Sequence, residues 1–170
     1  LLGTRLLDEN GLELEQMVQK GSFGAALYNH ALTVINGDLT DPAAIDKLVT
    51  IFGTDPDFSL ANTSAAATYA KRRSFTGAEE GYFFDIKQNL LTAKAAIQAG
   101  ETFNGQRDEA LAEYLLNWEK SNFATVIFYC NATKLFLQDG SSDEVLGNAM
   151  HAYAEGVAFA HGFRGLSNKL

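Results

Sequence analysis

Apolar and small residues recur at three- and four-residue steps over much of this chain, which is the period of an α-helix with one buried face. The first such segment runs from about residue 12 to residue 35, and its expected buried face is Leu14, Met17 or Val18, Gly21, Ala25, Tyr28, Leu32 and Ile35. Gly21 and Gly24 lie in its interior, where each glycine costs about 1 kcal/mol relative to alanine. An intact helix there predicts that another helix approaches closely at these two glycines.

The remaining helices are bounded by residues that typically start or stop a helix. In the second one, Thr40 or Asp41 is the expected N-cap, Pro42 suits the first turn, and Gly53 can end the helix. Gly100 is the expected end of a later helix. The expected helices cover residues 12–35, 40–53, 65–73, 79–99, 106–138 and 142–164.

The longest of these patterns changes character along its length. Its first half is amphipathic, with Leu111 and Trp118 on one stripe, whereas its second half, "FATVIFYCNATKLFL", is apolar on nearly every side. Because water penalises exposed apolar surface, we expect this helix to be central and the most buried element of the fold. We also expect Trp118 to pack beside the first long helix, in the space left by its two interior glycines.

The composition supports a helical domain of ordinary size. At 170 residues and 46% hydrophobic composition, the chain is large enough to bury a sizeable core, and the alternation typical of strands is almost absent. The expected fold is an all-α helical bundle that forms a single domain over residues 1–170. The chain begins "LLGTRLLDENG" without an initiator methionine, so we expect a mature form or the C-terminal part of a longer protein.

Charge and motif content exclude several classes of function. A formal net charge of −8 argues against a nucleic-acid partner, because such binding depends on clustered lysine and arginine. No apolar run reaches the length of a membrane span, and no signal peptide is recognisable. The single cysteine, Cys130, excludes an intrachain disulfide, and its apolar neighbours predict a small core residue. Signatures of hydrolases, P-loop proteins and dinucleotide-binding enzymes are missing, which favours a protein that is not an enzyme.

One stretch, "HAYAEGVAFAHGF", combines polar residues with an otherwise apolar helix. His151 and Glu155 are four positions apart and therefore share a helical face, whereas His161 points elsewhere. Small residues occupy the same side, and bulkier ones the opposite side: Gly147, Ala154, Ala158, Gly162 and Gly165 against Met150, Tyr153, Val157 and Ala160. Such a strip lets a second helix approach closely, or leaves a narrow groove.

Besides a plain solvent-exposed face, two interpretations of this stretch stay open. In the first, His151 and Glu155 satisfy each other and the polar groups of a neighbouring helix. In the second, they are half of a site for a divalent metal, iron or zinc, completed by facing helices. We take His151, Glu155, Trp118 and Tyr153 as candidate residues of a ligand groove between the last helix and the longest one, with His151 and Glu155 as the metal candidates.

Four motifs, in this order, resemble an imelysin-like bacterial family of helical, usually lipid-anchored proteins: "GLELEQMVQKGSFGAALYNHAL", "FGTDPDFS…YAKRRS", "NWEKSNFATVIFYCNAT" and "HAYAEGVAFAHGF". The resemblance implies a bundle-like fold facing the periplasm or the cell exterior, near a group linked to iron or other ligand uptake and to peptidase activity. Imelysins carry a glycine-histidine-x-x-glutamate motif that this chain lacks. The nearest match is His151 with Glu155, whose spacing is one residue longer than in the motif. The segment "IDKLVTIFG" stands where the family has a histidine-rich helix.

Three functions follow as hypotheses. The first is a non-enzymatic extracytoplasmic binding module for a small ligand or a metal ion. The second is a metal-dependent peptidase or hydrolase, which would require at least three converging ligands and a general base. The third is a structural or protein-interaction domain. The sequence leaves the oligomeric state open.

Overall fold

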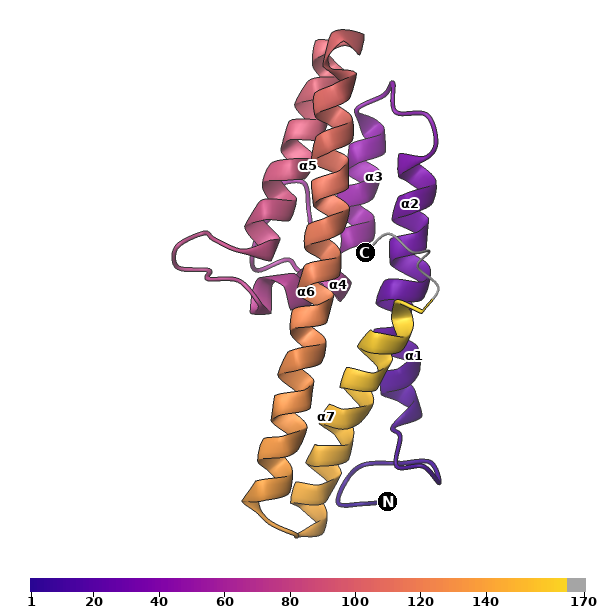
Figure 1. Cartoon of the computed structure of the whole chain (residues 1–170), viewed down its shortest axis with the longest axis vertical. Helices are drawn as coiled ribbons and strands as arrows, with labels where there is room; N and C mark the ends of the chain where they lie inside the picture. The colour runs from indigo at the N-terminus through magenta and orange to yellow at the C-terminus, as the bar shows by residue number, and fades with distance from the viewer. Residues whose placement is uncertain (165–170) are drawn as a thin grey trace. The chain divides into compact units, whose positions relative to one another are not determined.

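The computed structural model describes residues 1–164 and is all-helical, as the sequence predicts (Figure 1). Helix accounts for 71% of the described residues, and no strand forms among them. The same residues include no helix that is both long enough and apolar enough to cross a membrane. The predicted all-α helical-bundle class is therefore confirmed.

The elements match the predicted ranges closely. They are α1 (Leu14–Ser22), a π-helical segment (Phe23–Tyr28), α2 (Asn29–Ile35), α3 (Ala43–Phe52), α4 (Ala65–Arg72), α5 (Tyr82–Ala99), a 3-10 turn (Glu101–Phe103), α6 (Asn104–Asp139) and α7 (Asp143–Gly162). Gly53 ends α3 in the left-handed conformation at φ 104°, and the Ser142 hydroxyl accepts a hydrogen bond from the Val145 amide at the start of α7. These are the stop and start signals that the sequence contains.

The first predicted helix is not a regular α-helix throughout. Its middle, Phe23–Tyr28, is π-helical, so the residues after this segment are rotated relative to those before it. No local sequence signal predicts such a segment, although it begins one residue before Gly24. The expectation of a single regular face along residues 12–35 is therefore incorrect.

The chain divides into two compact units, each with its own packing. Unit 1 contains residues 1–26 and the described residues from 123 onward, and unit 2 contains residues 27–122. The first half of α6, residues 104–122, belongs to unit 2, and its second half, residues 123–139, belongs to unit 1. The predicted single domain over residues 1–170 stays a prediction.

Unit 2 has an aromatic core around Trp118. This side chain is 0% exposed, which confirms that it is buried. Its ring centre lies 5.4 Å from that of Tyr28, 5.3 Å from that of Phe52 and 5.8 Å from that of Tyr114. All three contacts have edge-to-face geometry, which aromatic pairs favour. Phe83 extends the cluster at 6.3 Å from Phe52.

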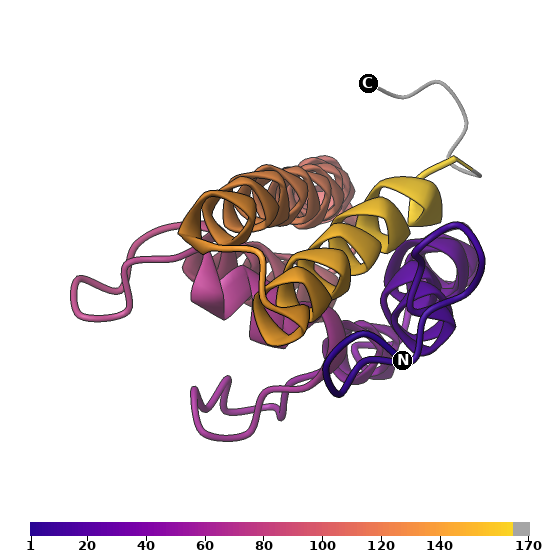
Figure 2. The same cartoon turned by 90° about the horizontal axis from the view of Figure 1, so that it is seen from below.

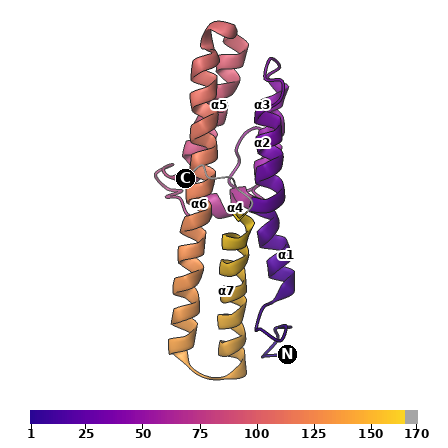
Figure 3. The same cartoon turned by 45° about the vertical axis from the view of Figure 1, so that its right-hand side comes forward.

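In unit 1, α7 lies between α1 and the second half of α6 (Figures 2 and 3). α7 approaches the first predicted helix as closely as the sequence predicts, because a Cβ atom at Gly24 would lie 2.6 Å from the carbonyl carbon of Gly162. A Cβ atom at Gly21 would lie 3.7 Å from the carbonyl oxygen of Ala158, which is an ordinary van der Waals contact. The space at the two glycines is thus filled by α7 and does not receive Trp118, which corrects that part of the prediction.

The second half of α6 contradicts the expectation that it is buried. Ile127 is 62% exposed, and Phe123, Phe128, Leu135, Phe136 and Leu137 are exposed as well. Within residues 123–139, only Thr125 and Tyr129 are buried. The expectation assumed a neighbour on every side of an all-round apolar helix, whereas in unit 1 this segment packs against α7 along one side. Apolar composition therefore did not imply burial.

Candidate functional site

His151 and Glu155 lie on the face of α7 that packs against α1, and they are within reach of each other. The Nε2 atom of His151 is 3.5 Å from Oε2 of Glu155, which confirms the predicted shared face. His161 is exposed to solvent, outside this α1–α7 contact. Of the small residues predicted to share this face, Gly165 lies outside the described residues.

The pair belongs to a longer series of alternating basic and acidic side chains in unit 1, which we call the ion-pair chain. Glu13 precedes α1, and its Oε2 atom lies 2.5 Å from Nδ1 of His151. Arg5 Nη1 is 3.8 Å from Oε1 of Glu13, and Lys20 Nζ is 3.4 Å from Oε1 of Glu155. The chain therefore runs Arg5, Glu13, His151, Glu155, Lys20, with each carboxylate between a basic side chain and the imidazole.

Three members of the ion-pair chain are shielded from water, whereas Arg5 and His151 are partly exposed. Glu155 is 6% exposed, and Glu13 and Lys20 are buried to a similar degree. Buried charges are tolerated when they are paired and hydrogen-bonded, which this alternation achieves. The arrangement matches the first interpretation of the stretch, in which His151 and Glu155 satisfy polar groups of a neighbouring helix.

Most of the buried face of α1 is not the face that the sequence pattern predicts. Gly21 of the predicted face does contact α7. Leu14 and either Met17 or Val18 were expected to be buried, but Leu14 and Val18 are exposed, Val18 at 76%, and Met17 is only partly buried. Glu13 and Lys20 face α7 instead, and Gln16 between them is also buried. Their spacing of three and four positions was a usable signal for a polar face, but only the partner residues on α7 explain why that face is buried.

A metal site is not assembled around this pair. Across residues 1–164, no group of three or more histidine, cysteine, aspartate or glutamate side chains is arranged to hold a metal ion. Both carboxylates beside His151 already have a cationic neighbour in Arg5 or Lys20. Metal binding by His151 and Glu155 stays a prediction.

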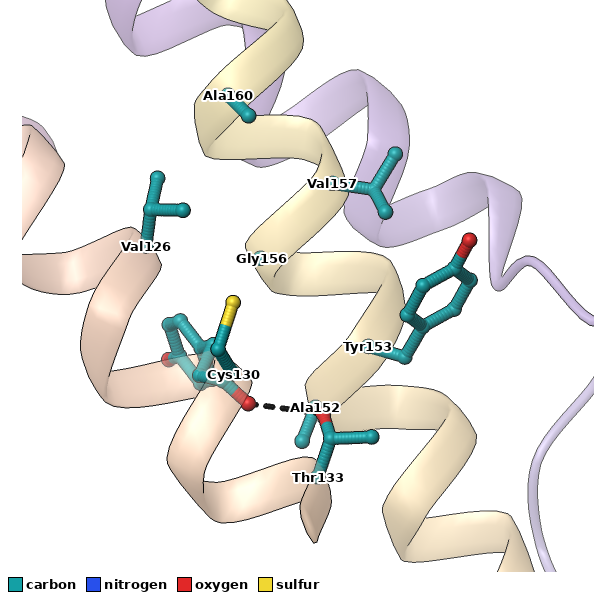
Figure 4. Close-up of a pocket in the computed structure, with 9 residues that line it drawn as sticks. Val126, Cys130, Thr133, Ala152, Tyr153, Gly156, Val157 and Ala160 are labelled. Carbon is teal, nitrogen blue, oxygen red and sulfur yellow. Dashed lines mark hydrogen bonds between the residues drawn. The ribbon is translucent and has the colours of Figure 1, made fainter.

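A separate groove runs between α6 and α7 on another side of α7, where the sequence analysis placed its candidate groove (Figure 4). Its volume is about 350 Å³. We call it the α6–α7 groove, and it is lined by Val126, Tyr129, Cys130, Thr133, Ala152, Tyr153, Gly156, Val157 and Ala160. Tyr153 is thus the one sequence-predicted groove residue in this lining, because His151 and Glu155 face α1 and Trp118 lies in the aromatic core of unit 2.

Small residues of α7 form the floor of the groove. A Cβ atom at Gly156 would lie 3.1 Å from Cβ of Tyr129, so the two helices approach closely at this level. Tyr129 also stacks on Phe159 at 6.0 Å, which fixes the spacing of α6 and α7 beside the groove. The Thr133 hydroxyl donates to the Tyr129 carbonyl oxygen at 2.8 Å, so it is satisfied within its own helix (Figure 4).

Cys130 is a surface residue of this groove, which corrects the expectation of a core residue. Its thiol is exposed, and the sulfur atom points into the space between the two helices (Figure 4). The local sequence around it is apolar, but that apolar segment is itself exposed. The error therefore has the same origin as the error for the second half of α6.

Exposed apolar side chains extend the groove along α6. At 100° per residue, Phe123, Ile127, Cys130 and Leu137 fall within about 80° of one another on the helix. The three large ones are all exposed, and Tyr153 is exposed on the α7 side. We call this surface, the α6–α7 groove together with Phe123, Ile127 and Leu137, the groove face.

Unit 2 contains a second buried polar group that sequence reasoning did not find. The Tyr28 hydroxyl donates a hydrogen bond to the buried carboxylate of Glu119. Burial raises the pKa of Tyr28 above its ordinary value, and the hydrogen bond to Glu119 raises it further. Burial also raises the pKa of Tyr114, with a smaller contribution from Tyr28. Burial in the aromatic core thus favours the neutral form of both phenols.

Comparison of the chain with protein-family models, with curated proteins and with solved structures finds no match. The imelysin-like resemblance therefore rests on the four motifs quoted above. Its implications for location and ligand stay predictions.

Proposed function

We propose that this chain is a non-enzymatic binding module and that the groove face is its binding surface. The observation that carries this proposal is the exposure of large apolar side chains on both sides of an apolar groove. Exposing such a patch to water raises the free energy of the folded protein by roughly 25 cal/mol per Å² of apolar surface. Patches of this kind mark sites where another apolar surface or ligand is bound.

The chemistry of the surface favours an apolar or amphipathic ligand. Tyr153 supplies an aromatic ring with a polar tip, a residue type that is enriched in binding interfaces. The charged side chains of unit 1 that are buried, Glu13, Lys20 and Glu155, belong to the α1–α7 contact and not to the groove lining. In this proposal the ion-pair chain connects α1 to α7, and the groove face on α6 and α7 binds the ligand.

Family and location enter this proposal through the sequence motifs. We propose an imelysin-like, lipid-anchored protein of the periplasm or cell surface, in which the groove face is presented outside the cytoplasm. Uptake of iron or another metal, metal-dependent peptidase activity and a purely structural role remain alternative functions. Calorimetric titration of zinc into the wild type and a His151→Ala, Glu155→Ala double variant tests the metal alternatives, and equal heats in both remove them.

A polarity-sensitive apolar dye tests the binding surface. We expect saturable fluorescence enhancement in the wild type and at least about fivefold weaker binding in Ile127→Gln and Tyr153→Gln, because each variant removes exposed apolar area from the groove face. Glutamine is a good helix former, so the helices are preserved. The matched control is Leu91→Gln on α5, which also replaces an exposed apolar helical residue. Equal binding by all four proteins would contradict the proposal.

A further inference from the structure

We propose that the groove face binds a second copy of this chain, with the two α6–α7 hairpins packed antiparallel about a two-fold axis. This inference rests on the proposed function, since it names the partner of the same surface. Three properties of the groove face support it: its size, its shape and the distribution of charge along it.

The area matches that of a stable dimer interface. The exposed portions of Phe123, Ile127, Leu137 and Tyr153, together with the exposed groove lining, amount to on the order of 700 Å² per copy. Standard specific interfaces bury roughly 800 Å² per partner. A small apolar ligand filling the groove would leave Ile127 and Leu137 in water, whereas a second hairpin would cover them.

The shape is self-complementary. The floor of the groove is made of small residues, Ala152, Gly156 and Ala160. Ile127 is 62% exposed on the same side of α6 as Cys130 of the lining, and Phe123, on that side as well, is partly exposed although its ring stacks on Phe163 at 5.2 Å. In a two-fold contact both copies use the same patch. The large side chains of each copy can therefore enter the groove of the other copy. One surface therefore provides both halves of the interface.

Charge selects the antiparallel arrangement. At the end of the hairpin next to the turn, Asp139, Asp143 and Glu144 are exposed, and at the other end of α7, Arg164 and His161 are exposed. An antiparallel pair places the acidic end of each copy near the basic end of the other, whereas a parallel pair places acidic ends together. Because this acidic chain is repelled by a second copy at long range, a local charge match matters for register.

The two-fold axis of such a pair passes through the middle of the groove, beside Tyr153. Cys130 shares the groove lining with Tyr153 and therefore lies at a similar level of the hairpin. The two Cys130 thiols of a dimer are then brought close to the axis, and because each chain has one cysteine, cross-linking between them is unambiguous.

Sedimentation equilibrium of the full chain from low to high micromolar concentration tests the proposal. We expect a monomer–dimer equilibrium in the wild type and at least about tenfold weaker dimerisation in Ile127→Gln and Tyr153→Gln, since central apolar residues dominate interface energetics. Leu91→Gln should dimerise like the wild type. Circular dichroism of each variant confirms that the helices are intact.

A charge exchange tests the orientation. Glu144→Arg and Arg164→Glu should each weaken the dimer, because each reduces the charge difference between the two ends of the hairpin that favours the antiparallel pair. A short bis-maleimide should join two wild-type chains through Cys130. Strengthening by Glu144→Arg alone would indicate a parallel pair and overturn the proposed arrangement.

The failure of this inference can be distinguished from failure of the proposed function. A wild-type chain that stays monomeric but binds the apolar dye at the groove face would overturn self-association and retain the binding module, with a partner of another kind. A chain that neither dimerises nor binds the dye would overturn both. Assemblies larger than a dimer would overturn the closed two-fold contact.

Discussion

The two halves of α6 have opposite surroundings, because the amphipathic first half contributes to a core while the more apolar second half is largely exposed. In residues 104–122 the large apolar side chains, such as Leu111, Tyr114 and Trp118, are buried in unit 2. In residues 123–139 most of them are exposed in unit 1. Hydrophobic composition therefore does not separate the core segment from the candidate binding segment, and the surroundings of each segment decide which role it has. This difference is the reason for assigning function to the second half.

The first prediction measures the difference between the halves directly. Trp118→Ala should lower the free energy of unfolding by about 3–5 kcal/mol, because it leaves a cavity among Tyr28, Phe52 and Tyr114. Leu137→Ala in the second half should change it by less than about 1 kcal/mol, because this residue is already 51% exposed in the folded chain. Urea unfolding followed by circular dichroism gives both values. A comparable loss in both variants would show that the second half is also core.

The second prediction extends the comparison to charged residues. Lys20→Met should destabilise the protein by roughly 3 kcal/mol, because Glu155 then keeps a buried charge without its lysine. The control is Lys94→Met, which removes a partner from the half-exposed pair between Lys94 and Asp46 and should cost less than about 1 kcal/mol. If the two lysine variants were equally stable, the ion-pair chain would not be the scaffold described here.

The third prediction concerns the pH dependence of the buried half of α6. The Tyr114 hydroxyl is fully buried, has no hydrogen-bond partner in the described part of the chain, and its pKa is raised by burial. Above about pH 10 the unfolded chain ionises this phenol while the folded chain does not, so stability is present below that pH and is lost as pH rises.

Tyr114→Phe removes this loss while keeping the shape of the ring. The fall in stability between pH 10 and 11.5 should become shallower by up to about 1.4 kcal/mol per pH unit, which is the contribution of one proton. At pH 7 the variant should be at least as stable as the wild type, since an unpartnered buried hydroxyl is removed. Urea unfolding at each pH supplies the slopes, and identical slopes would contradict the burial of this phenol.

The sequence predicted the helices well because their boundaries are set locally. Gly53, Gly100 and Ser142 act within one turn of their own helix, and the close approach at Gly24 follows from the cost of a glycine inside a helix. The shared face of His151 and Glu155 follows from helical geometry alone. Predictions of this kind need no knowledge of the rest of the fold.

The sequence failed where burial depends on a distant neighbour. Glu13 and His151 are 138 positions apart, so nothing in the local pattern shows that a polar face of α1 is the buried one. The prediction that Ile127 is buried is wrong for the same reason, because the sequence of an apolar segment does not show how many helices surround it. A groove between α6 and α7 was expected, but along the strip of small residues beside His151 and Glu155; that strip packs against α1, and the groove is lined by Tyr153, Val157 and Ala160 of the opposite side.

The reactivity of Cys130 tests the central claim, that the second half of α6 is a binding surface and not core. Its rate of alkylation should be measured on the native chain, as a function of protein concentration, and compared with the rate in denaturant. At low concentration we predict a rate within about tenfold of the denatured rate, falling as concentration rises and the groove face is covered. Strong protection at every concentration, relieved only by unfolding, would place Cys130 in the core and contradict the account.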